Sequence, residues 1–425
     1  MTMLNRNNAP ALNLSEKITI PAAKKNHLNN NTPVIILNSG TQEVIKIELV
    51  FEAGSAYTSH PIFASSCNRL IEEGSGNYSS AEIAEMLDQY GAYFVTESGN
   101  EFASISLYTT GRFISQTLPV LQTILSEPTF AEEEINTFKI QGQQRLAVNL
   151  NKVDFIARRS FLNTLYGDHH PLGILTQHDD FDKLNKGALT EFYNSHYRNK
   201  LRAVFIAGKF NEVEEKNMIN LLESLQFNHS NTKGKSDSTI LIPKELYINK
   251  KDSVQAAIRI GKKMFTRNHP DYYDFVIMNT ILGGYFGSRL MSNIREDKGY
   301  TYGIGSGLAT DINDAYFFIA TEVGATVVQD AVKEIYFEVE RLQNDLVPEE
   351  ELELVKNYLF GSFQRSIDGV FAVSERHKTL HLNNLDETHY LNYIQRLNSI
   401  TPEDISACAR KHLDKSTFTQ VIVGP

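Results

Sequence analysis

The sequence predicts an α+β protein made of two similar domains, each a mostly antiparallel sheet with helices packed on it. Three observations lead to this prediction. Two distant segments share one pattern, the other strands and helices follow in the same order in both halves, and strands are mixed with helices without strict alternation. A polar stretch between the halves, residues 226–238, is rich in Gly, Ser, Asn and Lys and therefore suits a linker.

The repeat is clearest at the end of each half. The two copies are LNKGALTEFYNSHYRNKLRAVFIAG, residues 184–208, and ITPEDISACARKHLDKSTFTQVIVG, residues 400–424. His196 matches His412 and Gly208 matches Gly424, both at an offset of 216 (412 − 196 and 424 − 208). Each copy predicts a helix that ends near the histidine, a short polar turn, and an apolar strand leading to the glycine.

The other elements pair more loosely, but they keep their order. The matched strands are Val44–Phe51 with Val254–Ile260 and Ala103–Leu107 with Tyr316–Ala320, and the matched helices are Ile62–Ile71 with Tyr272–Leu282 and those beginning at Phe113 and Val327. We therefore expect a flexible tail over 1–16, a first domain over 17–228, a linker over 229–238 and a second domain over 239–425.

Composition favours a globular protein that binds neither nucleic acid nor membrane. The chain is 41% hydrophobic and 22% charged, with a net charge of −10, and nucleic-acid-binding domains usually carry a basic patch. Cys67 and Cys408 form no CxxC pair, so they indicate neither a disulfide framework nor a zinc finger. No signal peptide is evident and no apolar run reaches the ~18 residues of a membrane span, so we expect a cytoplasmic protein.

Three motifs carry a resemblance to a known family. They are SSAEIAEMLDQYG at Ser79–Gly91, YGDHHPLG at Tyr166–Gly173, and GSRLMSNIREDKGYTYG at Gly287–Gly303. With the duplicated plan, they make residues 35–424 similar to the pitrilysin/insulinase family of zinc peptidases, and the third motif is the most specific. The resemblance implies the processing-peptidase-like duplicated fold.

The resemblance also shows what this chain lacks. Active relatives carry His-x-x-Glu-His on a first-domain helix, where two histidines at i and i+4 hold zinc and the glutamate activates water. Aligned on the following Gly-Ser, those positions hold Ser65, Asn68 and Arg69. Serine is a poor zinc ligand, asparagine is no general base, and arginine is permanently charged.

The third zinc ligand of the relatives is also missing. It is a glutamate roughly 75 residues downstream of the motif, and here that position falls at Gln144 or Arg145. Residues 136–152 contain no acidic side chain. We therefore expect no catalytic group and no bound metal in this chain.

The second-domain signature is retained. Arg295 and Tyr302 have the family's spacing of seven, and the resemblance implies that they contact peptide near the scissile bond. A guanidinium and a phenol can both donate to a peptide carbonyl. The spacing alone instead favours a structural interpretation, in which Arg295, Glu296 and Lys298 form a solvated helix end stopped by Gly299 and Tyr302 is a half-buried strand residue.

These features predict a non-catalytic, substrate-binding subunit of a two-chain zinc metallopeptidase, inactive alone. The partner would be a homologous subunit that carries the zinc, and peptide could add to the strand edge at Tyr93-Phe94-Val95, where relatives often have an Asn. A homodimer is also possible. The alternative is an inactive homologue with a binding or structural role. An independent enzyme of new chemistry would need a catalytic grouping that the sequence does not offer.

We interpret the remaining motifs as structural and not as functional sites. We interpret His377 and His381 as helix-surface histidines, because no acid lies between them and no third ligand is evident. His169 and His170 are adjacent and should point apart. The glycines of Gly303–Gly307 lack the Lys-Ser/Thr of a phosphate loop, and Cys67 suits a small core residue.

Overall fold

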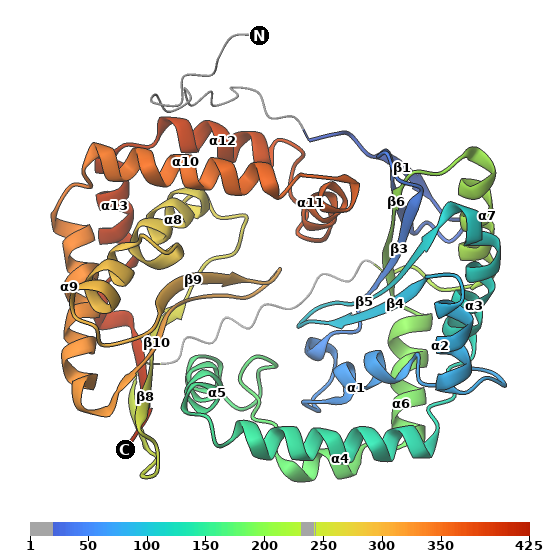
Figure 1. Cartoon of the computed structure of the whole chain (residues 1–425), viewed down its shortest axis with the longest axis horizontal. Coiled ribbons are helices and arrows are strands. Elements are labelled where there is room, and N and C mark those ends of the chain that lie inside the picture. The colour runs from blue at the N-terminus through green and yellow to red at the C-terminus, as the bar shows by residue number, and fades with distance from the viewer. Residues whose placement is uncertain (1–19, 231–241, 243) are drawn as a thin grey trace, which may run out of the picture.

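A computed structural model describes residues 20–230, 242 and 244–425. The predicted tail over 1–16 and most of the predicted linker over 229–238 lie outside these residues. Each half of the chain builds its own sheet, and the two sheets lie on opposite sides of the molecule (Figure 1).

The first sheet has six strands in the order β1-β2-β6-β3-β5-β4. Its strands are β1 (Lys24–His27), β2 (Pro33–Asn38), β3 (Val44–Phe51), β4 (Tyr93–Ser98), β5 (Ala103–Thr110) and β6 (Leu201–Gly208). Only β2 and β6 pair in parallel, and β4 lies at one edge.

The second sheet repeats this plan with five strands in the order β7-β11-β8-β10-β9. Its strands are β7 (Glu245–Asn249), β8 (Gln255–Lys263), β9 (Ile304–Thr310), β10 (Ala315–Gly324) and β11 (Thr419–Gly424). Here β7 and β11 form the one parallel pair, as β2 and β6 do in the first sheet. The α+β class and the duplication are confirmed, while β1 is an additional edge strand that the repeat did not predict.

Helices of the same half cover one face of each sheet. On the first sheet these include α1 (Phe63–Leu70), α2 (Ser80–Asp88), α3 (Ile114–Ser126), α6 (Lys186–Phe192) and α7 (Glu212–Ser224), with α4 (Glu132–Asn149) alongside. On the second they are α8 (Tyr272–Asn279), α9 (Val328–Asn344), α10 (Glu349–Arg365), α12 (His389–Ser399) and α13 (Pro402–His412).

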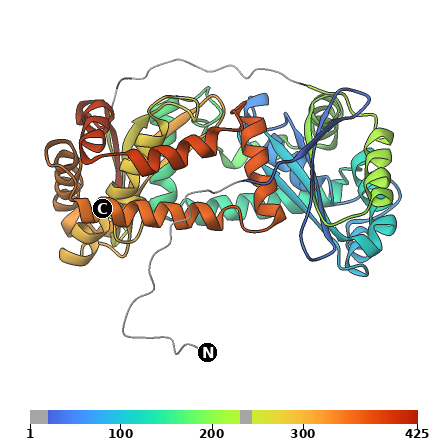
Figure 2. The ribbon, with the colours of Figure 1, turned by 90° about the horizontal axis from the view of Figure 1, so that it is seen from above.

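Each half also lends one helix to the other half. α5 (Val153–Tyr166), from the first half, packs on β8 and β11, and α11 (Val370–Leu382), from the second, packs on β6 and β2. We call these contacts the α5 junction and the α11 junction. Figure 2 shows the two halves side by side, with the orange and red helices of the second half reaching toward the first.

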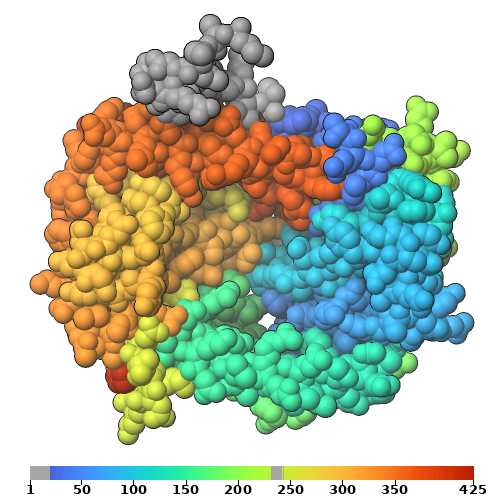
Figure 3. Space-filling model, viewed as in Figure 1, coloured from blue at the N-terminus to red at the C-terminus, as the bar shows by residue number. Residues whose placement is uncertain are grey.

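A third contact joins the turns at the inner ends of two hairpins. Glu101, in the β4–β5 turn, accepts hydrogen bonds from the backbone nitrogen of Asn313 at 3.2 Å and from its side-chain amide at 3.5 Å. Beside it, Nε2 of His170 lies 3.4 Å from a carboxylate oxygen of Asp314. The hairpins meet near the centre of the molecule (Figure 1), where the space-filling view is hollowed (Figure 3).

The local signals in the sequence explain where several helices begin and end. Ser79 with Glu82 and Thr401 with Asp404 form capping boxes at the starts of α2 and α13. The repeated helix ends at His412 in the second copy. In the first copy it continues through a π-helical turn to Arg198, so the prediction that it ends near His196 is two residues short.

Short helical turns complete the description. The 3₁₀ turns are Ser55–Tyr57, Gly111–Phe113, His178–Lys183, Ala325–Val327 and Lys415–Thr417, and the π-helical turns are Tyr193–Arg198, Thr280–Gly284 and Met291–Asp297. Among the described residues, no helix combines the length and the apolar character that crossing a bilayer would need.

Candidate functional site

The positions that hold zinc in the relatives lie on α1, and their side chains point in different directions. Ser65 and Arg69 are exposed on one side of the helix, as expected for residues four apart. Asn68 is only 2% exposed, and its amide donates to the carbonyl of Ser104 on β5 at 3.3 Å. The hydroxyl of Ser65 donates to the carbonyl of Ile62 at 3.1 Å. Asn68 therefore serves as a link between helix and sheet.

Arg69 is held by two carboxylates that follow α1. Its guanidinium pairs with Glu72 and, at 2.9 Å, with Glu73. Burial raises the pKa of Glu72, and the negative charge of Glu73 raises it further, while Arg69 opposes both effects. The position of the relatives' second histidine thus carries a fixed positive charge with its own counter-ions.

These side chains do not fit a zinc ion. Gln144 and Arg145, at the expected position of the third ligand, are exposed on α4. A zinc site needs thiolate, imidazole or carboxylate donors, and the five positions supply a hydroxyl, two amides and two guanidinium groups. No step of metal chemistry can be assigned to this helix.

The second-domain pair, in contrast, forms one compact structure. Nε of Arg295 donates to the backbone carbonyl of Tyr302 at 3.0 Å, and its guanidinium lies 4.7 Å from the ring centre of Phe286. Gly299, with φ of +67°, ends the π-helical turn between them and lets the chain double back. Arg295 is thereby positioned by the backbone of its predicted partner and by Phe286, and it also pairs with Glu296 at 3.8 Å.

Tyr302 is 93% exposed, so the reading of this tyrosine as a half-buried strand residue is wrong. Phe286 is also largely exposed. The guanidinium, which lies over Phe286 and bonds to the backbone of Tyr302, provides donors, and the two exposed rings provide apolar surface. Sequence reasoning missed Phe286, although its place just before the Gly-Ser of the third motif was a usable signal.

The Arg295–Tyr302 structure lies away from the contact between the hairpins. It precedes β9, while the turn that touches Glu101 follows β9. Seven residues of strand separate the two ends by about 20 Å. No hydrogen bond, ion pair or ring contact within residues 20–230, 242 and 244–425 joins Arg295 or Tyr302 to α1.

Within the described residues, each sheet ends in one edge strand on the side away from its parallel pair, β4 in the first sheet and β9 in the second. β4 pairs only with β5, and β9 only with β10, so each presents one row of unpaired backbone groups. Tyr93 on β4 is exposed and stacks on Tyr108 with ring centres 4.6 Å apart. The apolar character that the sequence predicted for this edge is therefore partly an aromatic surface.

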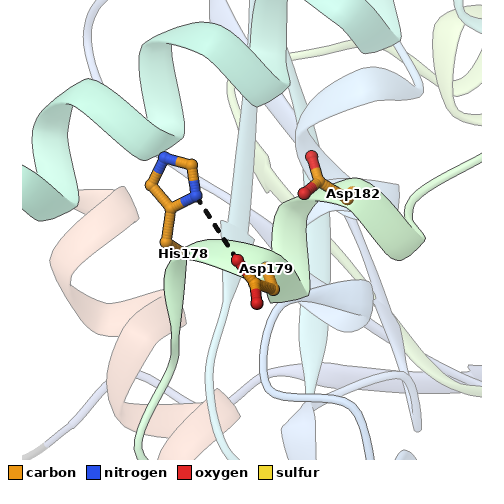
Figure 4. A group of neighbouring side chains, drawn as sticks. All are labelled: His178, Asp179 and Asp182. Atoms are coloured by element: carbon orange, nitrogen blue, oxygen red, sulfur yellow. Dashed lines mark ion pairs between the residues drawn. The ribbon is translucent and has the colours of Figure 1, made fainter.

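One group of possible metal ligands was not singled out from the sequence. His178, Asp179 and Asp182 lie on one 3₁₀ turn and offer atoms within 4.8 Å of one another (Figure 4). All three are exposed, and Asp182 accepts a hydrogen bond from the side chain of Gln143 at 3.1 Å. Exposed acids of this kind are common on solvated turns without a bound ion.

The structure agrees with most of the motifs that the sequence analysis interpreted as structural. His169 is exposed while His170 is buried, so the two do point apart. The glycines after Gly303 belong to β9, where a side chain at Gly307 would collide with the ring of Phe318. Cys67 is fully buried, and burial raises the pKa of its thiol well above the usual value.

The assignment of His377 and His381 to a helix surface needs correction. Both lie in the α11 junction, on the side of α11 that faces the first sheet, and each is only partly exposed. His377 hydrogen bonds through Nε2 to the carbonyl of Pro21 at 2.9 Å, and the ring of His381 lies 6.1 Å from that of Phe205 on β6. No local pattern reveals this contact, because the two elements are far apart in the chain.

Comparisons with known proteins agree with this architecture. The family model described as "Peptidase M16 inactive domain" matches residues 183–359. The chain is 24% identical over 420 residues to the uncharacterized zinc protease YmxG of Bacillus subtilis, covering 95% of this chain and 98% of that protein.

Solved structures share the fold at low identity. A peptidase M16 inactive domain from Pseudomonas fluorescens has a TM-score of 0.86 at 20% identity, covering 95% of this chain and 98% of that one. A protease from Helicobacter pylori has a TM-score of 0.83 at 17% identity, covering 96% and 100%. The periplasmic protease PqqL of Escherichia coli has a TM-score of 0.76 at 14% identity over 99% of this chain and 48% of that one.

Proposed function

We propose a role for this chain from the premise that it belongs to the pitrilysin/insulinase (M16) family of peptidases. The chain is the non-catalytic subunit of a two-chain zinc peptidase and binds the peptide that its partner cleaves. The partner is a homologous subunit with His-x-x-Glu-His, which supplies the zinc and the general base. We propose the cytoplasm as its compartment.

One contrast within the chain carries this proposal. The α1 positions have been given over to structural contacts, whereas Arg295 is fixed by Tyr302 and Phe286 and faces outward with them. An isolated chain gains little from holding a guanidinium and two aromatic rings in the open, because exposed rings cost free energy in water. A bound peptide or partner would cover them.

Arg295 and Tyr302 would act on the peptide as hydrogen-bond donors. A guanidinium already held on one side keeps its remaining N–H groups directed, so little side-chain entropy is lost on binding. Donors of this kind stabilise the negative charge that develops on the carbonyl oxygen during attack. The open edge of β4 would align the chain of the peptide through backbone hydrogen bonds.

The experiment is co-expression with a zinc-bearing homologue from the same cells, followed by hydrolysis of a quenched fluorescent peptide library. We expect activity only from the pair. Arg295→Ala should lower kcat/KM about 100-fold, the usual effect of removing one donor to the developing oxyanion. Tyr302→Phe should lower it less, because the ring remains.

Lys298→Ala is the matched control, since Lys298 is an exposed cation three residues away that pairs with Glu334 at 3.7 Å. It should leave turnover unchanged. A pair that cleaves peptide equally well with Arg295→Ala would refute the substrate-binding role. A pair that forms but cleaves nothing would favour the alternative, a structural assembly protein.

A further inference from the structure

A cavity of about 390 Å³ lies within the α11 junction, apart from α1 and from Arg295. Its walls come from β1, β2 and β6 of the first half and from α11 and the following loop of the second. The ionisable residues lining it are Lys25, Arg202, His229, His377, His381 and Glu387. Pockets of this size commonly hold small molecules.

The cavity is strongly biased toward positive charge. Lys25 and Arg202 are cations at neutral pH, and three histidines lie beside them. Glu387 is the one carboxylate of the lining, and it already pairs with Lys25. Such a bias is uncommon in a protein of net charge −10, where acids outnumber bases.

Several donors already have a fixed direction. His229 donates from Nδ1 to the carbonyl of Leu201 at 3.1 Å, so its Nε2 donates to an anion only when the ring is protonated. Arg202 is 6% exposed and donates from one Nη to the side chain of Asn384 at 3.4 Å. Nε2 of His381 is buried and has no hydrogen-bond partner among the described residues. Buried polar atoms are usually satisfied, so this nitrogen points to a missing ligand.

The electrostatics of His381 support the same reading. Burial lowers its pKa to about 4, and the positive charges of Arg202 and Lys25 lower it further, with smaller effects of His229 and His27. His377 lies on the same helix, and Glu387 is the acid nearest to it in the lining. Burial disfavours charge of either sign, so it is the effect of Arg202 and Lys25 on this pKa that indicates a positive potential, which an anion would lower.

We propose that this cavity binds the phosphoryl group of a small molecule. A phosphoryl group offers three terminal oxygens and close to two negative charges, which matches cationic and N–H donors converging from β6, α11 and the loop after α7. A carboxylate would satisfy fewer of them. The ligand would touch both halves, so its binding would be coupled to the packing of α11 on the first sheet.

The probes are sulfate, which stays a dianion across the range, and phenyl phosphate, titrated into the full-length chain by calorimetry with chloride replacing them at constant ionic strength. One site per chain is expected. Tighter binding of phenyl phosphate than of sulfate indicates a phosphorylated small molecule, and equal binding indicates a free inorganic oxyanion. Sulfate should bind more tightly at pH 6 than at pH 8, because the anion draws a proton onto His381.

Arg202→Gln and His381→Gln should each weaken binding at least about tenfold, the loss expected for one hydrogen bond to a charged group. His381→Gln should also reduce the pH dependence. Arg112→Gln and His178→Gln, exposed residues elsewhere in the first half, are the matched controls and should bind as the parent does. Because Arg202 is buried, circular dichroism checks that the Arg202→Gln variant is folded. His381→Gln tests the same cavity independently. No saturable binding, or equal binding by all four variants, would overturn the proposal.

Discussion

The two junctions between the halves occupy equivalent places in the duplicated fold, but their chemistry differs. At the α5 junction, Ala157, Phe161 and Leu165 pack on Ala257 and Val421 of the second sheet, and all five are buried. At the α11 junction, apolar contacts are limited to small clusters around Val373 and Leu382, and charged side chains lie between them.

The charged part of the α11 junction is a closed network of four residues. Lys46 contacts Glu48 and Glu375, both at 2.7 Å, and Lys378 contacts the same two acids at 2.8 Å and 2.6 Å. Lys46 and Glu48 are almost fully buried. Burial by itself would lower the pKa of Lys46, but the two acids outweigh it and raise the pKa; the two lysines lower the pKa of Glu375 against the effect of burial.

The difference teaches that one fold can join its halves in two physically distinct ways. The stabilisation from an apolar junction increases with its buried area, and such a junction tolerates small changes of shape. A buried ionic junction contributes little net stability, because the cost of desolvation offsets the attraction. Removing one of its charges is nevertheless strongly destabilising, because the partner charge is left buried and unpaired. The α5 junction therefore contributes stability, and the α11 junction fixes the position of α11 on the first sheet.

The largest effect should come from breaking the ionic junction on one side. Glu48→Ala leaves the ammonium groups of Lys46 and Lys378 buried with only Glu375 between them, and should lower the free energy of unfolding by about 3–5 kcal/mol. Urea denaturation measures the loss. Glu340→Ala removes one partner of an exposed pair with Lys415 and should cost less than about 1 kcal/mol. Equal losses in the two variants would contradict a special role for the network.

A cavity in the apolar junction should have a somewhat smaller effect. Leu165→Ala removes a buried side chain between α5 and the second sheet and should cost about 2–4 kcal/mol. The loss should depend little on salt or pH, because the substitution removes no charge and leaves the pair of Asp154 and Arg259 at this junction intact. Leu346→Ala, at an exposed leucine, is the control and should change stability little. A strongly salt-dependent loss at Leu165 would mean that the junctions are less distinct than they look.

The hairpin contact tests whether charge also limits the α5 side. Burial raises the pKa of Glu101 to about 7, and Asp311 and Asp314 contribute, while the hydrogen bond from Asn313 opposes them. The unfolded carboxyl titrates near 4.5, so the folded state loses stability as pH rises from about 4.5 to about 7, by up to roughly 3 kcal/mol.

Glu101→Gln should therefore stabilise the protein by about 1–3 kcal/mol near pH 8, and the gain should disappear as pH falls toward about 4.5. Melting temperatures across this range give the measurement. Glu97→Gln, at an exposed position on β4, should show no such trend. A gain that grew toward acid would reverse the sign of the argument.

The smallest change should follow from making the two junctions alike. The triple variant Lys46→Met, Glu48→Leu and Lys378→Met replaces the buried charges together and leaves Glu375, which is partly exposed, to solvent. Stability should stay within about 1–2 kcal/mol of the parent or rise, because no buried charge remains uncompensated. A loss as large as that of Glu48→Ala would show that the network stabilises the fold beyond its pairing.

The order of strands and the duplication could be predicted because their signals are local and repeated. Alternation, glycines and caps fix β3, β6, β11 and the helices between them to within a few residues. The positions of Ser65, Asn68 and Arg69 follow from one motif. The backbone anchor of Arg295 on Tyr302 does not, since a spacing of seven fits several turn geometries.

The α11 junction could not be predicted, and β3 shows why. In VIKIELVF, Lys46 and Glu48 alternate with isoleucines, a pattern that normally places charges in water. They are buried because α11 covers them, more than 300 residues later in the chain (375 − 48 = 327). Period-two alternation identifies which side chains of β3 share one face of the sheet. Whether that face is exposed to solvent depends on which element packs on it in the tertiary structure.

The exchange of helices has a consequence for synthesis on the ribosome. α5 ends at Tyr166, whereas β11, against which it packs, begins at Thr419, 253 residues later (419 − 166). β8 is made earlier, but at typical translation rates the part of α5 that packs on β11 stays uncovered for roughly 10–50 seconds. The nascent chain therefore exposes part of an apolar helix until its last strand has been made.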